Sequence, residues 1–196
     1  MEILAVASGL AREQGLAGWT LRDLARRLGM AAPSLYSYFA SKDALHDAMF
    51  AQGNRELLAV QIGRGQDLRE QLGLMARGFV RFCVEDPVRY QLLFQRTIPG
   101  FTPSEESWAL ARAAYDHFMS PLAEFGLSAE PDLDLVTGVV SGLIDQQLSN
   151  DPGGDRWVKL LDPALDMLAA HFTNRPTNRS AVRADRRVRS RRTRKE

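Results

Sequence analysis

Apolar residues recur every three or four positions along most of this chain, which is the spacing that gathers them on one face of a helix. In the opening segment, Ile3, Ala7 and Leu10 share such a face. Beyond residue 50 every segment has helical spacing, no stretch alternates apolar and polar residues as a half-buried strand does, and no internal repeat occurs. The pattern predicts an all-α fold.

Residues 20–45 predict two short helices joined by a tight turn, followed by the start of a third helix. Thr20 can cap the first helix through its hydroxyl while Asp23 answers the backbone N–H of Thr20, which is a capping box. Three leucines at helical spacing give that helix one buried side. Gly29 supplies the positive φ that ends it in a sharp turn.

Proline and serine bound the second of these helices. Proline is tolerated only in a first helical turn, so Pro33 places the start of the helix near residue 31 or 32, and we expect it to run to Phe39. Ser41 then caps the third helix. This arrangement is a helix-turn-helix, which presents its second helix to DNA.

The rest of the chain predicts a helical body. Its expected helices, in chain order, cover residues 44–62, 68–85, 88–95, a segment capped by Ser104, 132–150 and 155–172. The last of these should kink or restart at Asp162-Pro163. The expected fold is therefore a three-helix head at the N-terminus followed by a larger helical unit.

Charge is distributed unevenly along the 196 residues, although the net charge is only +1. Residues 175–196 hold ten Arg or Lys and two acidic residues, so this segment carries +8 and the rest of the chain −7. Because so few of its residues are apolar, we expect a disordered basic tail. It is either a solvated extension without a function or a source of non-specific attraction to phosphates. The expected domains are 1–48, 49–174 and this tail.

Composition and motifs exclude several classes of protein. No run of about 18 apolar residues occurs, and Glu2 stands where a signal peptide would be basic, so we expect a cytoplasmic protein. A single cysteine, Cys83, rules out an internal disulfide and a cysteine metal cluster. His46, His117 and His171 lie far apart, and no nucleophile, metal or phosphate-loop motif is present. We therefore expect neither an enzyme nor a cofactor.

At the helix-turn-helix the chain resembles the TetR family of bacterial transcriptional repressors. The residues that match at the family's spacings are Thr20, Arg22, Leu24-Ala25, Leu28-Gly29, Leu35-Tyr36, Tyr38-Phe39, Ser41-Lys42 and Asp43-Ala44-Leu45. The family's usual Ser at the opening of the recognition helix is Ala31 here, and its small Gly two residues later is Pro33. The resemblance covers about a quarter of the chain. It implies a DNA-binding head and a body that binds a ligand and forms a dimer.

The resemblance implies a set of residues that contact a double-stranded DNA operator. The residues that would face the bases, mostly through small side chains, are Ala32, Pro33, Ser34 and Ser37. The residues that would hold phosphates and set the register are Thr20, Arg22, Tyr36, Tyr38 and Lys42. Without a role in binding, the same side chains would serve as helix caps and core edges.

The resemblance also implies a ligand site in the body, where aromatic and sulfur-containing side chains gather. The candidates are Met75, Phe79, Phe82, Tyr90, Phe94, Trp108, Tyr115, Phe118 and Met119. As a set they suggest a mostly apolar effector, whereas each residue alone could equally belong to an ordinary core. Arg112, Asp116 and His117 are the candidates for polar contacts with that ligand.

The last two helices, at about 132–150 and 155–172, would pair with those of a second copy to form a homodimer. The apolar residues that suggest an interface are Val136, Val139, Val140, Leu143, Ile144 and Leu148 on the first helix and Trp157, Leu161, Leu165, Leu168 and Phe172 on the second. They make more apolar surface than one neighbour needs, and the alternative is an ordinary buried core.

These expectations combine in a ligand-responsive transcriptional regulator. Its simplest form is a repressor that binds a palindromic operator as a dimer and is released by a small apolar molecule. An activator or architectural protein that binds DNA without a ligand is the alternative, and a helical adaptor without specific DNA binding is a third possibility.

Overall fold

The computed structural model describes residues 2–175, and all regular structure in this part of the chain is helical, as predicted. The α-helices are α1 (Glu2–Gln14), α2 (Leu21–Arg27), α3 (Ala32–Tyr36), α4 (Lys42–Leu58), α5 (Leu68–Glu85), α6 (Pro87–Phe94), α7 (Glu105–Met119), α8 (Glu130–Asn150) and α9 (Leu161–Thr173). Two 3₁₀ helices, η1 (Ser120–Phe125) and η2 (Val158–Leu160), precede α8 and α9. Except for Arg175, the predicted basic tail, residues 175–196, lies outside the described residues.

Polar side chains fix the beginnings of several helices. The predicted capping box is confirmed: the Asp23 N–H donates to the Thr20 hydroxyl at 3.2 Å, and the Thr20 N–H donates to the Asp23 carboxylate at 2.9 Å. Ser41 and Ser104 cap α4 and α7 as predicted. By contrast, α3 begins without a side-chain cap because Ala31 has no polar atom to offer. This helix of five residues therefore depends on packing against the other helices of the head.

Three predicted helix limits were wrong. Helix α9 begins at Leu161 and not at residue 155, and the 3₁₀ helix η2 precedes it. Helix α3 ends at Tyr36 and not at Phe39: residues 37–38 form a turn, in which the Ser37 hydroxyl donates to the Ser34 carbonyl at 2.7 Å. Helix α4 ends at Leu58 and not at residue 62. The carbonyl of Val60 contacts the His117 ring at 2.9 Å in place of a helical partner, which holds residues 59–62 against α7.

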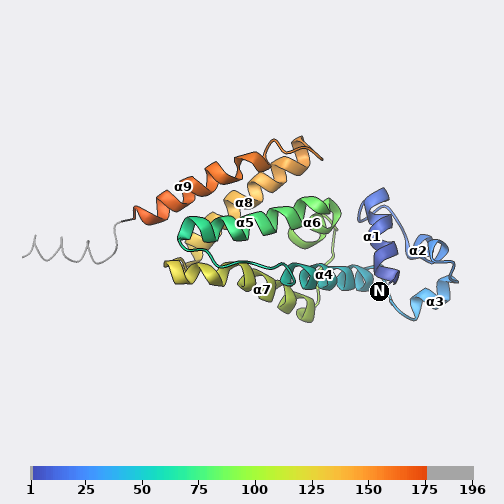
Figure 1. Ribbon diagram of the computed structural model, residues 1–196. Helices are drawn as coiled ribbons and strands as arrows, with labels where there is room; N and C mark the ends of the chain where they lie inside the picture. The colour runs from blue at the N-terminus through green and yellow to red at the C-terminus, as the bar shows by residue number, and fades with distance from the viewer. Residues whose placement is uncertain (1, 176–196) are drawn as a thin grey trace, which may run out of the picture.

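Two separate apolar cores organise the helices. Trp19, Leu24 and Leu35 are buried in the core of the head, which α1, α2 and α3 form at one end of the molecule (Figure 1). Helix α4 leaves the head and runs beside α7 along the body. It contributes Leu45 to the head core and Leu57 to the body core. The expected boundary at residue 48 therefore falls inside a continuous helix that both units share.

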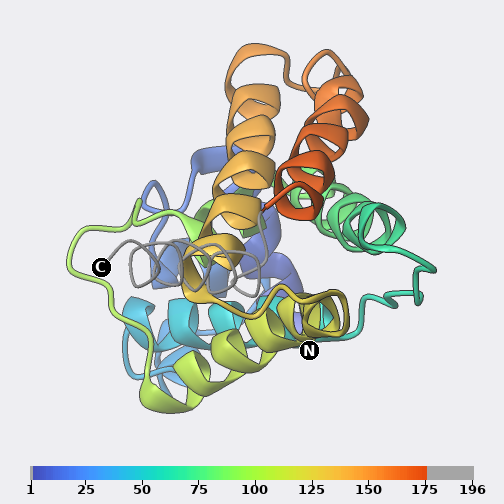
Figure 2. The same cartoon turned by 90° about the vertical axis from the view of Figure 1, so that its left-hand side faces the viewer.

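Helices α8 and α9 close the other side of the body and pack on α5. Figure 2, which views the molecule from the end opposite the head, shows the two helices side by side along one side of the body. Arg69 of α5 reaches the carboxylates of Asp162 and Asp166 on α9, at 2.9 and 2.5 Å. None of the described helices is long and apolar enough to cross a lipid bilayer.

Candidate nucleic-acid interface and ligand cavity

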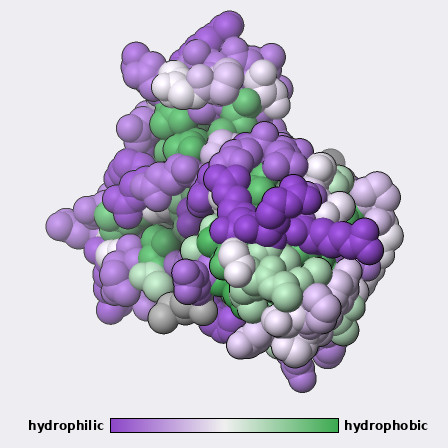
Figure 3. All heavy atoms as spheres, turned by 90° about the vertical axis from the view of Figure 1, so that its right-hand side faces the viewer, coloured by the Kyte–Doolittle hydropathy of each residue, from purple (hydrophilic) through white to green (hydrophobic). Residues whose placement is uncertain are grey.

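The outer end of the head carries the second helix of the helix-turn-helix. Figure 3, which views this end, shows hydrophilic side chains over much of the surface with smaller apolar areas between them. Seven residues predicted to contact DNA are exposed: Thr20, Arg22, Pro33, Ser34, Tyr36, Ser37 and Tyr38. The rings of Tyr36 and Tyr38 are 48% and 66% exposed, so both phenols are free to meet a partner.

The other two predicted contacts are partly buried. Ala32 packs against the core of the head. The Lys42 ammonium donates to the carbonyls of Ala17 and Trp19 and lies 4.4 Å from the centre of the Trp19 ring. Its partial burial lowers its pKa from the ordinary value. Lys42 thus ties the start of α4 to the loop between α1 and α2.

Arg26 is an exposed cation on the head that was not among the predicted contacts. Arg26 follows Arg22 by one helical turn, so the two guanidiniums share a face of α2. The Arg26 side chain is 79% exposed and lies 3.3 Å from Asp23. The Thr20 hydroxyl and backbone N–H, with Arg26, lower the pKa of the Asp23 carboxyl, which therefore stays ionised. The i to i+4 spacing of the two arginines was the signal in the sequence that could have identified Arg26.

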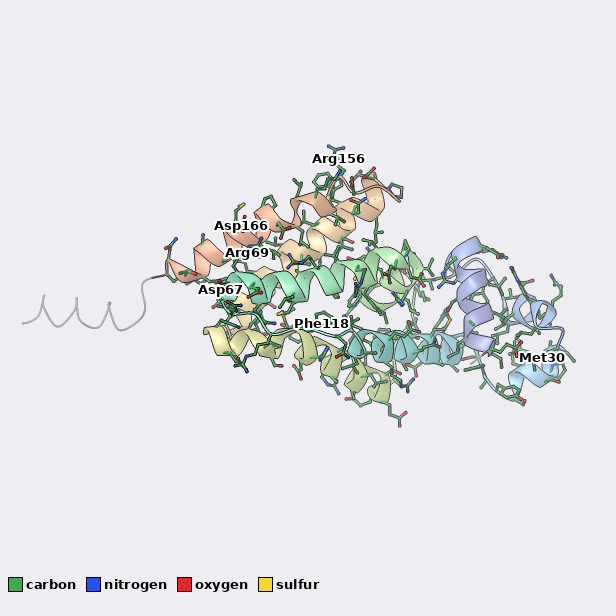
Figure 4. The ribbon with its side chains drawn as sticks, in the orientation of Figure 1. Met30, Asp67, Arg69, Phe118, Arg156 and Asp166 are labelled. Atoms are coloured by element: carbon green, nitrogen blue, oxygen red, sulfur yellow. The ribbon has the colours of Figure 1, made fainter. Side chains whose placement is uncertain are left out.

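The body holds a cavity of about 250 Å³ between α4, α5, α6, α7 and α8. Seven of the nine predicted ligand-binding residues line it: Met75, Phe79, Phe94, Trp108, Tyr115, Phe118 and Met119. Phe118, labelled in Figure 4, lies in the interior of the body. Its ring meets that of Phe79 edge to face at 5.7 Å, and Phe79 meets Phe94 in the same way at 5.2 Å. The cavity therefore has a wall of interlocked aromatic rings.

Phe82 and Tyr90 lie outside this lining. The Phe82 ring packs under the guanidinium of Arg89, 3.7 Å away. The Tyr90 hydroxyl donates to Asp145 at 2.8 Å, and burial with this carboxylate raises the pKa of Tyr90. Each side chain points away from the face of its helix that lines the cavity. Phe82 therefore links α5 to α6, and Tyr90 links α6 to α8.

The polar contacts expected in the cavity come from other residues. None of the three expected residues, Arg112, Asp116 and His117, lines the cavity. Arg112 pairs with Glu105, and the His117 ring contacts the Val60 carbonyl. The polar side chains in the lining, apart from the Trp108 and Tyr115 rings, belong to Asn54, Thr137 and Ser141. Sequence reasoning missed the α8 wall because it assigned the apolar residues of that helix to a dimer interface.

The outer faces of α8 and α9 carry only part of the predicted interface, because Val139, Leu143, Leu148 and Trp157 are partly exposed while the other predicted residues are buried. Val136, Val140, Ile144, Leu161, Leu165, Leu168 and Phe172 are buried within the body. Leu135, Leu160 and Met167 point outward and are 40%, 44% and 74% exposed. A Cβ added at Gly138 or Gly142 would meet no atom within 4 Å, so α8 is open to close approach along this face. An unpartnered apolar stripe thus runs over both helices.

The loop between α6 and α7, residues 95–104, connects the body to the start of α4. The Ser104 N–H and hydroxyl both donate to the Asp47 carboxylate at 2.8 Å. Phe101 meets the buried ring of His46 edge to face at 5.6 Å, and His46 meets Trp19 of the head at 5.9 Å. Burial and the nearby Lys42 lower the pKa of His46, so the imidazole is neutral.

No group of side chains in the described part of the chain is arranged to hold a metal ion. The Cys83 thiol is buried, and burial raises its pKa far above the range in which a thiolate forms. Cys83 is therefore a core residue and not a nucleophile.

Residues 3–49 match the family model described as bacterial regulatory proteins, tetR family. The chain is 27% identical over 118 residues to the HTH-type transcriptional regulator Rv1816 of Mycobacterium tuberculosis. This match covers 57% of this chain and 50% of that protein. It is 26% identical over 186 residues to the HTH-type transcriptional repressor Rv1353c of the same species, which covers 89% of this chain and 70% of that protein. The chain thus spans about half the length of the first of these relatives.

Solved structures share the arrangement of both units. A protein of unknown function from Rhodococcus has a TM-score of 0.71 at 20% identity, over 86% of this chain and 92% of that one. A variant of TetR from Acinetobacter baumannii, in complex with minocycline, has a TM-score of 0.56 at 25% identity, over 87% of this chain and 94% of that one. The first likeness shows the fold alone.

Proposed function

Because this chain belongs to the TetR family, whose members are DNA-binding transcriptional regulators and not enzymes, we propose that it is a dimeric repressor released from its operator by a small molecule. As a regulator of bacterial genes it would act in the cytoplasm. Its shared features with a TetR solved in complex with minocycline support a role for the body in binding an effector.

The observation that carries this proposal is the course of α4. The first turns of this helix pack into the core of the head through Leu45, and its later turns line the cavity through Asn54 and Leu57. A molecule that moves the cavity wall therefore acts on the same rigid helix that positions the head. The ligand needs only a difference in affinity between the two positions of the heads to shift the equilibrium.

In the proposed complex, the exposed face of α3 enters the major groove. Ser34, Pro33 and Ser37, with the partly buried Ala32, meet the base edges through small side chains, which favours apolar and water-mediated readout. The residues assigned to phosphates are Thr20, Arg22, Tyr36, Tyr38 and Lys42, and Arg26 joins them because it is exposed beside Arg22. Lys42 would use the N–H that its two carbonyl partners leave available.

The proposed dimer forms through α8 and α9. Its support is the exposed stripe of Leu135, Leu160 and Met167, together with the open surface at Gly138 and Gly142. Two-fold symmetry would then place two recognition helices in successive major grooves, about 34 Å apart, on a palindromic operator.

The first experiment measures binding of the purified protein to the DNA upstream of its own gene, with random competitor DNA, at about 50 and 200 mM salt. We expect specific binding that Tyr36→Ala weakens and that Arg81→Ala, an exposed exchange on α5 outside the cavity, leaves unchanged. A chain truncated after Arg175 should lose part of the salt dependence if its basic tail attracts phosphates. Absence of specific binding at both salt concentrations would refute the repressor function.

The same assay separates a repressor from an activator or architectural protein that has no ligand. A compound that stabilises the protein against heat and also lowers its affinity for the operator supports the proposal. If every compound that binds the body leaves operator binding unchanged, the release mechanism is wrong.

A further inference from the structure

The walls of the cavity contain no ionisable side chain with a charge at neutral pH. Its lining, all within the described residues, includes no Asp, Glu, Lys, Arg or His. An ion placed there would lose its hydration without gaining a partner, which is far more costly than burying a neutral group. Outside the lining, the carboxylates of Asp134, Glu130 and Asp116 approach Tyr115, and these charges, with burial as the larger cause, raise the pKa of that phenol. Anions are therefore disfavoured at Tyr115 as well as inside.

One polar side chain in the lining is fully enclosed by protein. Asn54 on α4 is 2% exposed, and its amide nitrogen donates to the Phe50 carbonyl at 3.0 Å. That bond fixes the orientation of the amide. Its carbonyl oxygen accepts no hydrogen bond from any group in residues 2–175, although an amide oxygen can accept two. Asn54 thus offers an unused acceptor in an otherwise apolar space.

Two hydroxyls on α8, those of Thr137 and Ser141, are further polar groups in the lining of the cavity. Thr137 donates its proton to the Leu133 carbonyl at 2.9 Å, so its oxygen has only lone pairs left for a ligand. Ser141, one turn further along α8, can donate or accept. The Trp108 indole N–H and the Tyr115 hydroxyl can donate, but these residues are 38% and 41% exposed, whereas Asn54 is 2% exposed. The most deeply buried free hydrogen-bonding position of the cavity is therefore the acceptor on Asn54, and it calls for a ligand with a donor.

The remaining wall favours a flat ligand. Phe79, Phe94 and Phe118 meet edge to face, which leaves ring faces and edges for an aromatic guest. Phe94, Trp108 and Tyr115 also line the cavity and are 42%, 38% and 41% exposed, so the aromatic wall reaches the surface. A planar molecule can enter between these rings without a charged group to hold it.

We propose that the effector is a neutral aromatic compound with one hydroxyl or N–H donor, and that this donor binds the carbonyl oxygen of Asn54. This inference rests on the proposed function in treating the cavity as the effector site. It makes Asn54 the residue that selects among aromatic ligands. Because Asn54 belongs to α4, the selective contact lies on the helix that carries the head.

The test uses four probes with the same ring system: naphthol, methoxynaphthalene, naphthoate and naphthylmethylammonium. Their affinities for the full-length protein without DNA are measured by calorimetry and by quenching of tryptophan fluorescence. We expect naphthol to bind up to about tenfold more tightly than methoxynaphthalene, which lacks the donor. Both ions should bind at least about 100-fold more weakly than naphthol. Equal affinities for naphthol and methoxynaphthalene, or tightest binding of either ion, would overturn the inference.

Two variants assign the donor contact to its residue. Asn54→Leu keeps the number and branching of the side-chain heavy atoms and removes the acceptor, so the preference for naphthol over methoxynaphthalene should fall below about twofold. Gln52→Ala, an exchange on the outer face of α4, should preserve the full preference. If Asn54→Leu fails to fold, the ranking of the four probes on the unaltered protein still decides the matter. A preserved preference in folded Asn54→Leu would contradict the assignment.

Operator release is measured separately, by fluorescence anisotropy of labelled DNA. If naphthol binds through Asn54 and leaves operator binding unchanged, the inferred preference of the cavity for a neutral aromatic donor is supported and the proposed release mechanism is wrong. If operator release follows the ionic probes instead, the proposed function stands and this inference fails.

Discussion

Met167 provides the sharpest test of how two copies of the chain associate. Met167 is 74% exposed on the outer face of α9. Full burial of a methionine side chain stabilises a protein by about 1.5–3 kcal/mol, so burial of the exposed three quarters is worth about 1–2 kcal/mol. A two-fold interface buries this side chain twice, which gives about 2–4 kcal/mol per dimer.

The corresponding perturbation is Met167→Ala, and its effect follows from that estimate. Since about 1.4 kcal/mol changes an equilibrium constant tenfold, the dissociation constant of the dimer should rise about 30- to 800-fold. The assay is analytical ultracentrifugation over a dilution series, with circular dichroism to establish that the variant is folded. Tyr38→Ala is the matched control, because Tyr38 is 66% exposed but lies in the head.

Two results would refute the reasoning about this interface. The first is a dissociation constant for Met167→Ala within about threefold of that of the unaltered protein, because it would mean that the side chain stays in water in the dimer. The second is an equal loss of association in Tyr38→Ala, because it would place the interface on the head.

Three further predictions concern stability. Thr20→Ala removes the capping box of α2 and should lower the free energy of unfolding by about 1 kcal/mol in urea titrations, whereas an unchanged midpoint would show that the box is dispensable. The pKa of His46 is lowered below its ordinary 6.5, so the unfolded chain binds a proton at this residue before the folded chain does, and the folded state loses stability as pH falls below about 6.5. In thermal melts over this pH range, His46→Phe should lose less stability than the unaltered protein. An equal loss in both proteins would show that His46 is not the source of the pH dependence. Arg69→Ala breaks the ion pairs with Asp162 and Asp166. Because these carboxylates are mostly exposed, the free energy of unfolding should fall by less than about 1 kcal/mol, and the difference should shrink in high salt. A difference that does not change with salt would contradict an ionic origin.

The head was predictable from sequence because its signals are local. The capping box at Thr20, the positive φ of Gly29 and the cap at Ser41 each act within a few residues of chain, and the structure confirms all three. The end of α3 was missed because the bond from the Ser37 hydroxyl to the Ser34 carbonyl is equally compatible with a further helical turn.

The body was less predictable because the direction of a side chain there depends on distant segments. Helix α8 is apolar on most sides, so its sequence cannot distinguish the face of Val136, which lines the cavity, from the face of Leu135, which points outward. Packing on α5 and α9 decides between them. Similarly, nothing near Asn54 in the sequence indicates a cavity, because the aromatic wall comes from helices that begin more than ten residues later.

The geometry of α4 explains how one cavity can influence the head by two routes. Eight residues, about 12 Å of rigid helix, separate Asn54 in the cavity from His46 in the junction with the head. The 95–104 loop supplies a second connection. Phe94 immediately before it and Trp108 in the first turn of α7 after it both line the cavity, while Ser104 holds Asp47 on α4. A guest that displaces either aromatic ring therefore pulls on the first turns of α4 through this loop, in addition to any movement of α4 itself. Since both routes reach α4 where it joins the core of the head, a small shift of the cavity wall need not be relayed through the dimer interface to change the position of the head.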